Sequence, residues 1–156
     1  MAANSARETL STAGERIHAA LASTTAYRRF SDADLEGLYG TARSFMSAGR
    51  YDKAMSMLAL CAMYRPQVAK YLVALGTCHR RLDQHEMAVQ AFALAAGLDP
   101  MRYDAALQTA ECLLRLRRRQ EAHHVLTSLV ECGKVMKEAA PFGTRAKVLL
   151  DLMEPA

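Results

Sequence analysis

Small, bulky and proline residues recur along the chain with a period of 34 residues. Ala54, Ala88 and Ala122 are spaced by this interval, and Pro66 and Pro100 are separated by one such interval. Between these markers the apolar positions follow helical spacing, with few of the β-branched residues that favour strands. The pattern predicts a repeat of paired helices.

When a unit is counted from Leu35, its eighth and twentieth positions are always alanine or glycine, and its twenty-fourth is always bulky. The eighth positions are Ala42, Gly76 and Ala110, and the twenty-fourth are Leu58, Phe92 and Leu126. Two antiparallel helices can cross closely only where the residues at the eighth and twentieth positions are both small. The bulky residue at the twenty-fourth position then fills the space beside the crossing. This is the tetratricopeptide pattern.

The expected fold is therefore all-α, with three tetratricopeptide helix pairs in a right-handed superhelix. The repeats should cover residues 35–68, 69–102 and 103–136 of a single domain spanning 1–156. First helices are expected at about 35–48, 69–82 and 103–116, and second helices at about 52–64, 86–98 and 120–132. Intra-repeat turns should contain Gly49 and Asp83, and Ser31 with Asp34 resembles a capping box that would start the first helix near Asp32.

Two further helices should flank the repeats. Residues 6–22 carry an apolar stripe of Leu10, Ala13, Ile17 and Leu21, which must be buried on the array or on a second copy of the chain. Residues 139–153 begin with a proline suited to a helix N-terminus and carry several apolar residues. This segment is expected to cap the exposed end of the last repeat.

Composition narrows the possible functions. The net charge of +4 is modest and is concentrated around Arg80-Arg81 and in an arginine cluster at 115–119, which we interpret mainly as solvated turns. The four cysteines form no C-x-x-C pair, so reduced, buried thiols are expected. No apolar run reaches the length needed to span a bilayer, and the N-terminus lacks the apolar segment of a cleaved signal. We expect a cytoplasmic protein that does not insert into membranes.

The sequence contains no recognisable catalytic chemistry. None of the five histidines has a carboxylate or cysteine at a spacing typical of metal sites, and no phosphate-binding glycine loop or nucleophile motif occurs. Cys78 and Cys112 occupy the same repeat position as Ser44, which indicates packing residues. We expect neither an enzyme nor a metal or cofactor site.

A short array of this kind instead offers a concave surface lined by its first helices. Apolar residues there could form pockets for an extended peptide, with arginines at the rim, although some of them, Leu107 especially, could simply pack within the array. The predicted peptide-binding residues are Tyr39, Arg43, Met46, Lys70, Val73, Thr77, Arg80, Leu107, Glu111 and Leu114.

Several segments resemble a known family, the class II chaperones of bacterial type III secretion systems, which bind pore-forming translocator proteins. The similar segments are LEGLY (35–39), SAGRYDKA (47–54), Leu60-Cys61, Leu75-Gly76 and TAECLLRL (109–116). The resemblance implies a cytoplasmic chaperone that holds one or two hydrophobic translocators before secretion, with an extended client segment in the groove, where Tyr39 matches a family aromatic. It also implies a homodimer in the free state, formed through the leading helix.

Other binding functions stay open at this stage. A generic tetratricopeptide scaffold would share the groove, whereas a clamp for acidic C-termini would need lysines and asparagines on the first helices, and the only asparagine is Asn4. An RNA-binding helical repeat is favoured only by the arginine cluster, because the repeats show no matched polar pairs that could read bases. We expect no nucleic-acid partner.

Overall fold

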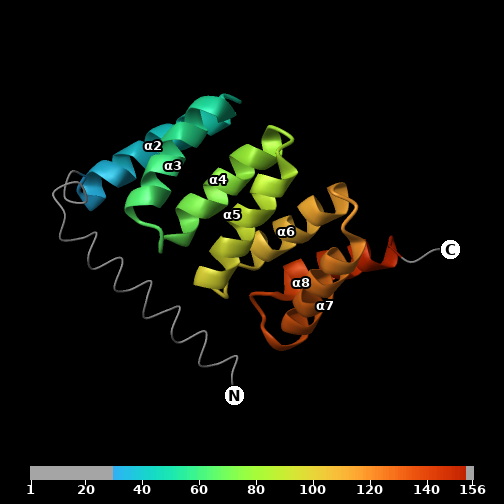
Figure 1. Ribbon diagram of the computed structural model, residues 1–156. Helices are drawn as coiled ribbons and strands as arrows, with labels where there is room; N and C mark the ends of the chain where they lie inside the picture. The colour runs from blue at the N-terminus through green and yellow to red at the C-terminus, as the bar shows by residue number, and fades with distance from the viewer. Residues whose placement is uncertain (1–29, 154–156) are drawn as a thin grey trace, which may run out of the picture. The chain divides into compact units, whose positions relative to one another are not determined.

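The computed structural model describes residues 30–153. The chain divides into two compact units, Met1–Gly37 and Leu38–Ala156. The predicted leading helix at 6–22, with Leu10, Ala13, Ile17 and Leu21, lies outside the described residues, so the predictions of that helix and of a single domain stay predictions. Residues 30–153 are helical throughout, without a strand, which confirms the all-α class (Figure 1).

Seven helices follow one another along the described chain. They are α2 (Asp32–Ser47), α3 (Tyr51–Tyr64), α4 (Ala69–Arg81), α5 (His85–Leu98), α6 (Tyr103–Arg115), α7 (Arg119–Val135) and α8 (Ala140–Asp151). The first six correspond to the three predicted pairs, with most ends within one or two residues of expectation. In the capping box at the start of α2, the Asp34 amide donates to Ser31 Oγ at 3.2 Å and the Ser31 amide donates to Asp34 Oδ2 at 2.8 Å.

The repeat positions that carry small and bulky residues form the core. Ala42, Ala110 and the alanines of the twentieth position are fully buried, and so are Leu58, Phe92 and Leu126. At the crossing of α4 and α5, a Cβ added to Gly76 would lie 2.8 Å from Phe92 Cε1. Only glycine therefore fits at position 76 without displacing this buried ring.

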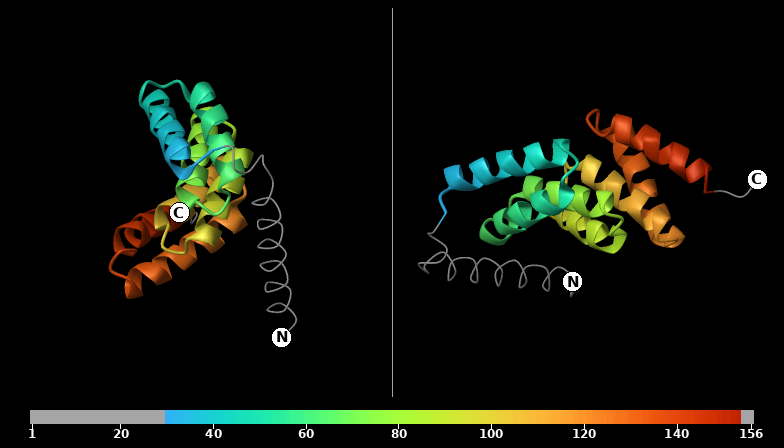
Figure 2. Two further views of the ribbon diagram at one scale, coloured as in Figure 1. Left: turned by 90° about the vertical axis from the view of Figure 1, so that its left-hand side faces the viewer. Right: turned by 90° about the horizontal axis from the view of Figure 1, so that it is seen from above.

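The second helix of the last repeat is longer than predicted. α7 continues to Val135, whereas α3 and α5 end just before Pro66 and Pro100. Because the third repeat has Lys134 in place of that proline, nothing stops the helix at the expected residue. α8 then begins with Pro141 in its first turn and packs against α7, where Gly133 and Gly143 meet closely (Figures 1 and 2).

None of the helices at 30–153 combines the length and the apolar character that a membrane span requires.

Candidate functional site

The first helices of the repeats border a hollow that collects six of the predicted peptide-binding residues. We call it the N-terminal hollow; its volume is about 460 Å³. Its lining residues are Tyr39, Arg43, Met46, Ser47, Tyr51, Lys70, Val73, Ala74, Thr77, Arg81 and Arg102. The repeat positions predicted from the sequence thus bring Tyr39, Met46 and Val73 together with Arg43, Lys70 and Thr77.

The aromatic and apolar side chains of this hollow are held by their neighbours. The rings of Tyr39 and Tyr71 lie 5.4 Å apart between centroids, and Lys70 Nζ lies 5.2 Å from the centre of the Tyr39 ring. Met46 packs against the core of α2, α3 and α4, and Val73 against the core of α4, α5 and α6. These side chains are half-buried, which leaves part of each apolar surface available to a ligand.

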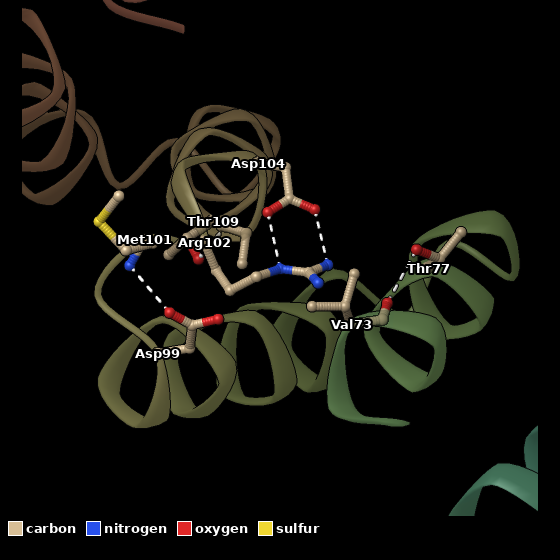
Figure 3. A network of polar contacts seen from close by, with 8 residues as sticks. Val73, Thr77, Asp99, Met101, Arg102, Asp104 and Thr109 are labelled. Atoms are coloured by element: carbon tan, nitrogen blue, oxygen red, sulfur yellow. Dashed lines mark hydrogen bonds and ion pairs between the residues drawn. The ribbon is translucent and has the colours of Figure 1, made fainter. Parts of the chain in front are cut away.

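Arg102 closes one side of the N-terminal hollow. Its guanidinium donates to both carboxylate oxygens of Asp104, at 2.9 and 2.8 Å, a bidentate geometry that fixes its direction. Figure 3 shows Arg102 reaching from the start of α6 toward α4, where the Thr77 hydroxyl donates to the Val73 carbonyl at 2.9 Å. The sequence did not predict Arg102 as a lining residue, because Arg102 precedes a first helix and lies outside the repeat positions that line the concave surface.

A second hollow, of about 610 Å³, contains three more predicted residues, Arg80, Glu111 and Leu114. We call it the arginine hollow. Its lining residues are Arg80, Arg81, Asp83, His85, Glu111, Cys112, Leu114, Arg115, Arg145 and Leu149. Arg145 and Leu149 come from α8, so the helix that caps the last repeat also supplies part of this surface.

Glu111 links three helices at the arginine hollow. Its carboxylate lies 3.5 Å from Arg80 Nη1 on α4 and 2.8 Å from Arg145 Nη2 on α8. Next to it, burial raises the pKa of the Cys112 thiol, while the positive charge of Arg80 acts in the opposite direction. A buried thiol held in its protonated form is a packing residue rather than a nucleophile.

Leu107 does not belong to either hollow. Its side chain is almost fully buried in a core cluster with Tyr103, Ala110 and Leu126. Of the two uses considered for Leu107, packing within the array is the one that this burial favours. The sequence alone could not decide this, because an apolar residue at a first-helix position serves either purpose.

Among residues 30–153, no three histidine, cysteine, aspartate or glutamate side chains gather where they could hold a metal ion.

Comparison with known proteins gives consistent similarities. No protein-family model matches the chain. The low calcium response locus protein H of Yersinia pestis is 26% identical over 121 residues, which are 77% of this chain and 71% of that protein. PcrH of Pseudomonas aeruginosa, solved with the chaperone-binding region of PopD, has a TM-score of 0.73 and 25% identity, covering 80% of this chain and 93% of PcrH.

Two further solved structures have the same fold. A type III secretion complex from Aeromonas hydrophila has a TM-score of 0.72 and 25% identity over 78% of this chain and 81% of that one. The translocator chaperone SycD of Yersinia enterocolitica has a TM-score of 0.72 at 23% identity, and the match covers 80% of this chain and 86% of SycD. In sequence and in fold the chain is thus similar to the translocator chaperones of bacterial type III secretion, and the resemblance that its motifs indicated is confirmed.

Proposed function

We propose that this chain is a type III secretion chaperone that binds hydrophobic pore-forming translocator proteins in the bacterial cytoplasm. The observation that carries the proposal is the similarity to PcrH, which was solved with the chaperone-binding regions of both PopD and PopB. SycD, which shares the fold, was solved with a peptide of the translocator YopD. Bound in this way, a translocator would be kept from aggregating and from associating prematurely before its secretion.

The N-terminal hollow supports this role through its chemistry. Proteins that insert into membranes expose apolar surface, which aggregates in water unless another surface covers it. Tyr39, Met46 and Val73 offer half-buried apolar surface for spaced aliphatic side chains of an extended segment. Met46 adds a flexible side chain that can adapt to more than one client. Such holding requires binding but no catalysis, and we propose none.

The first experiment identifies the client. The tagged chain is expressed in its native bacterium under secretion-inducing conditions, and co-purifying proteins are identified by mass spectrometry. We expect one or two hydrophobic secreted proteins. Recovery of RNA, or of heat-shock proteins alone, would contradict the chaperone function, and recovery of unrelated soluble proteins would favour a generic scaffold.

The second experiment locates the binding surface. The double variant Tyr39→Ala, Val73→Asp removes the aromatic side chain and places a charge in the N-terminal hollow, so it should no longer co-purify the client. Val135→Asp is the matched control, because Val135 is 82% exposed and lies at the end of α7. Circular dichroism checks that both variants fold. If the double variant does not fold, the single variant Met46→Glu is used for the same test. Undiminished binding would show that the client binds outside this hollow.

A further inference from the structure

The arginine hollow has more positive charge than its own carboxylates neutralise. Among residues 30–153, four arginines line it, Arg80, Arg81, Arg115 and Arg145, against two carboxylates, Asp83 and Glu111. Arg80 is half-buried and the other three arginines are exposed. Charges of one sign around a concave surface raise the local concentration of groups of the opposite sign. The hollow is therefore attractive to an anionic group.

Arg80 and Arg115 have nitrogen donors that the described carboxylates of this hollow do not fully satisfy. Arg80 Nη1 lies 3.5 Å from Glu111, longer than a charge-assisted hydrogen bond, and Arg80 Nε is buried without a hydrogen-bond partner. His85 lines the same hollow, with its Nε2 3.7 Å from Asp83 Oδ1. Within residues 30–153, Arg115 has no carboxylate within ion-pair distance. Because buried donors in folded proteins are nearly always hydrogen-bonded, Arg80 Nε favours an acceptor that enters this hollow.

The apolar part of the lining limits what this ligand can be. Leu114 and Leu149 border the same hollow, and Leu149 packs against the core of α6, α7 and α8. Aliphatic side chains next to guanidinium groups suit a carboxylate beside an aliphatic residue. A nucleic-acid backbone would instead need a continuous cationic track with aromatic residues for stacking, and among the described residues no phenylalanine, tyrosine or tryptophan lines this hollow.

The two hollows are connected through a shared residue. Arg81, at the end of α4, lines both of them. Among the described residues no carboxylate lines the N-terminal hollow, which Arg43 and Lys70 line together with Arg102, whose charge is paired with Asp104. A segment that occupies the N-terminal hollow and reaches Arg81 is therefore in contact with a residue of the arginine hollow as well.

We propose that the arginine hollow binds an aspartate or glutamate side chain, next to an aliphatic one, in the same client segment that occupies the N-terminal hollow. The inference rests on the proposed function, since it assigns a sequence preference to the client. The acidic residue would set the register of the segment, while the apolar residues would supply most of the contact.

The test measures client affinity by calorimetry, using the full chain and the translocator recovered by co-purification. Arg80→Gln and Arg115→Gln should each weaken binding about three- to tenfold at low salt. Lys147→Gln should leave it unchanged. Lys147 is a matched control because it is exposed on α8, two residues from Arg145, and does not line the hollow.

The affinity of the wild type should fall with added salt more steeply than that of either hollow variant. Equal affinities for all four proteins would overturn the inference and leave the proposed function intact.

A second arm does not depend on the client. Two capped heptapeptides, glycine-serine-leucine-glutamate-leucine-serine-glycine and its glutamine counterpart, are titrated into isotopically labelled full chain while the arginine Nε–Hε signals are followed by NMR. The glutamate peptide should shift these signals in the wild type but not in Arg115→Gln, and the glutamine peptide should shift them much less. This result would support the inference even if no translocator were recovered. Equal responses to both peptides, or displacement of the glutamate peptide by oligouridylate, would overturn it.

Discussion

Gly76 and Phe92 meet so closely that the residue type at position 76 controls the crossing of α4 and α5. An added Cβ would lie 2.8 Å from a ring that is fully buried and cannot turn aside. Gly76→Ala should therefore lower the free energy of unfolding by about 1 to 3 kcal/mol, measured by urea denaturation. Gly97→Ala is the control in the same helix pair, because nothing lies within 4 Å of its Cβ. It should raise stability by about 0.5 to 1 kcal/mol; an equal effect of both substitutions would contradict this packing.

Cys78 makes stability depend on pH in the alkaline range. Its side chain is fully buried, and burial raises the pKa of the thiol from 9.0 to about 11. Between these values the folded chain keeps a proton that the unfolded chain has lost. The contribution of the thiol is thus complete below pH 9 and lost as the pH rises through 11.

This prediction is measured against a variant that lacks the thiol. The free energy of unfolding of the wild type should fall by about 2 kcal/mol more than that of Cys78→Ala between pH 8.5 and pH 11. Tyrosines and lysines titrate in both proteins, so their effects cancel in the comparison. Parallel pH profiles would show that Cys78 titrates normally.

Within each repeat, the turn between the two helices places one residue in a left-handed conformation. Gly49, Asp83 and Arg117 occupy the same repeat position and have φ angles of 74°, 58° and 59°. The sequence indicated the first two, since glycine and aspartate are common at turns. Arg117 was not predicted as a turn residue, because it lies within a run of arginines. Only its repeat position, which it shares with Gly49 and Asp83, indicates the turn.

Arg117→Gly should relieve strain in the turn between α6 and α7. A side chain in the left-handed region costs about 1 to 2 kcal/mol, and glycine offsets part of this gain by its greater freedom when unfolded. We expect thermal unfolding to show a net gain of about 0.5 to 1 kcal/mol. The control is Lys53→Gly, on the exposed side of α3, which should lose a similar amount. A loss of stability in Arg117→Gly would mean that its side chain makes contacts worth more than the strain.

The last two helices show where the pattern of repeats stops being informative. The capping helix was predicted at nearly its observed position, because a proline and apolar periodicity mark it. Its packing was not predicted: an added Cβ on Gly143 would lie 3.0 Å from Gly133 Cα, so two glycines set this crossing outside the repeat positions. A glycine within a helical pattern does not by itself reveal which helix approaches it.

The same limit applies to the candidate site as a whole. Repeat positions predicted six of the nine residues that α2 and α4 contribute to the N-terminal hollow, because equivalent positions of a solenoid face the same side. They could not predict Arg145 and Leu149, which reach the arginine hollow from a helix that belongs to no repeat. Nor could repeat positions distinguish Leu107, which is buried in the core, from Leu114, which borders a hollow. The difference between these two leucines depends on how α7 and α8 pack.

We expect the assembly of the chain to depend on the predicted helix at residues 6–22. Its stripe of Leu10, Ala13, Ile17 and Leu21 is predicted from the sequence alone, and SycD was solved in an alternative dimer. We propose that the free chain is a homodimer held by this stripe, because an amphipathic helix must bury its apolar face.

Deleting residues 1–22 should therefore convert the dimer into a monomer in sedimentation velocity, at concentrations where the full chain remains dimeric. The matched variant Leu10→Glu, Ile17→Glu keeps the length of the chain and should have the same effect, since charges on the stripe oppose its burial. Its counterpart Glu8→Gln, Glu15→Gln changes two polar residues of the same segment and should stay dimeric. The repeats contain their own buried core, so both monomeric proteins should keep their helical circular dichroism. A deletion variant that still sediments as a dimer would contradict this proposal and place the interface on the repeats themselves.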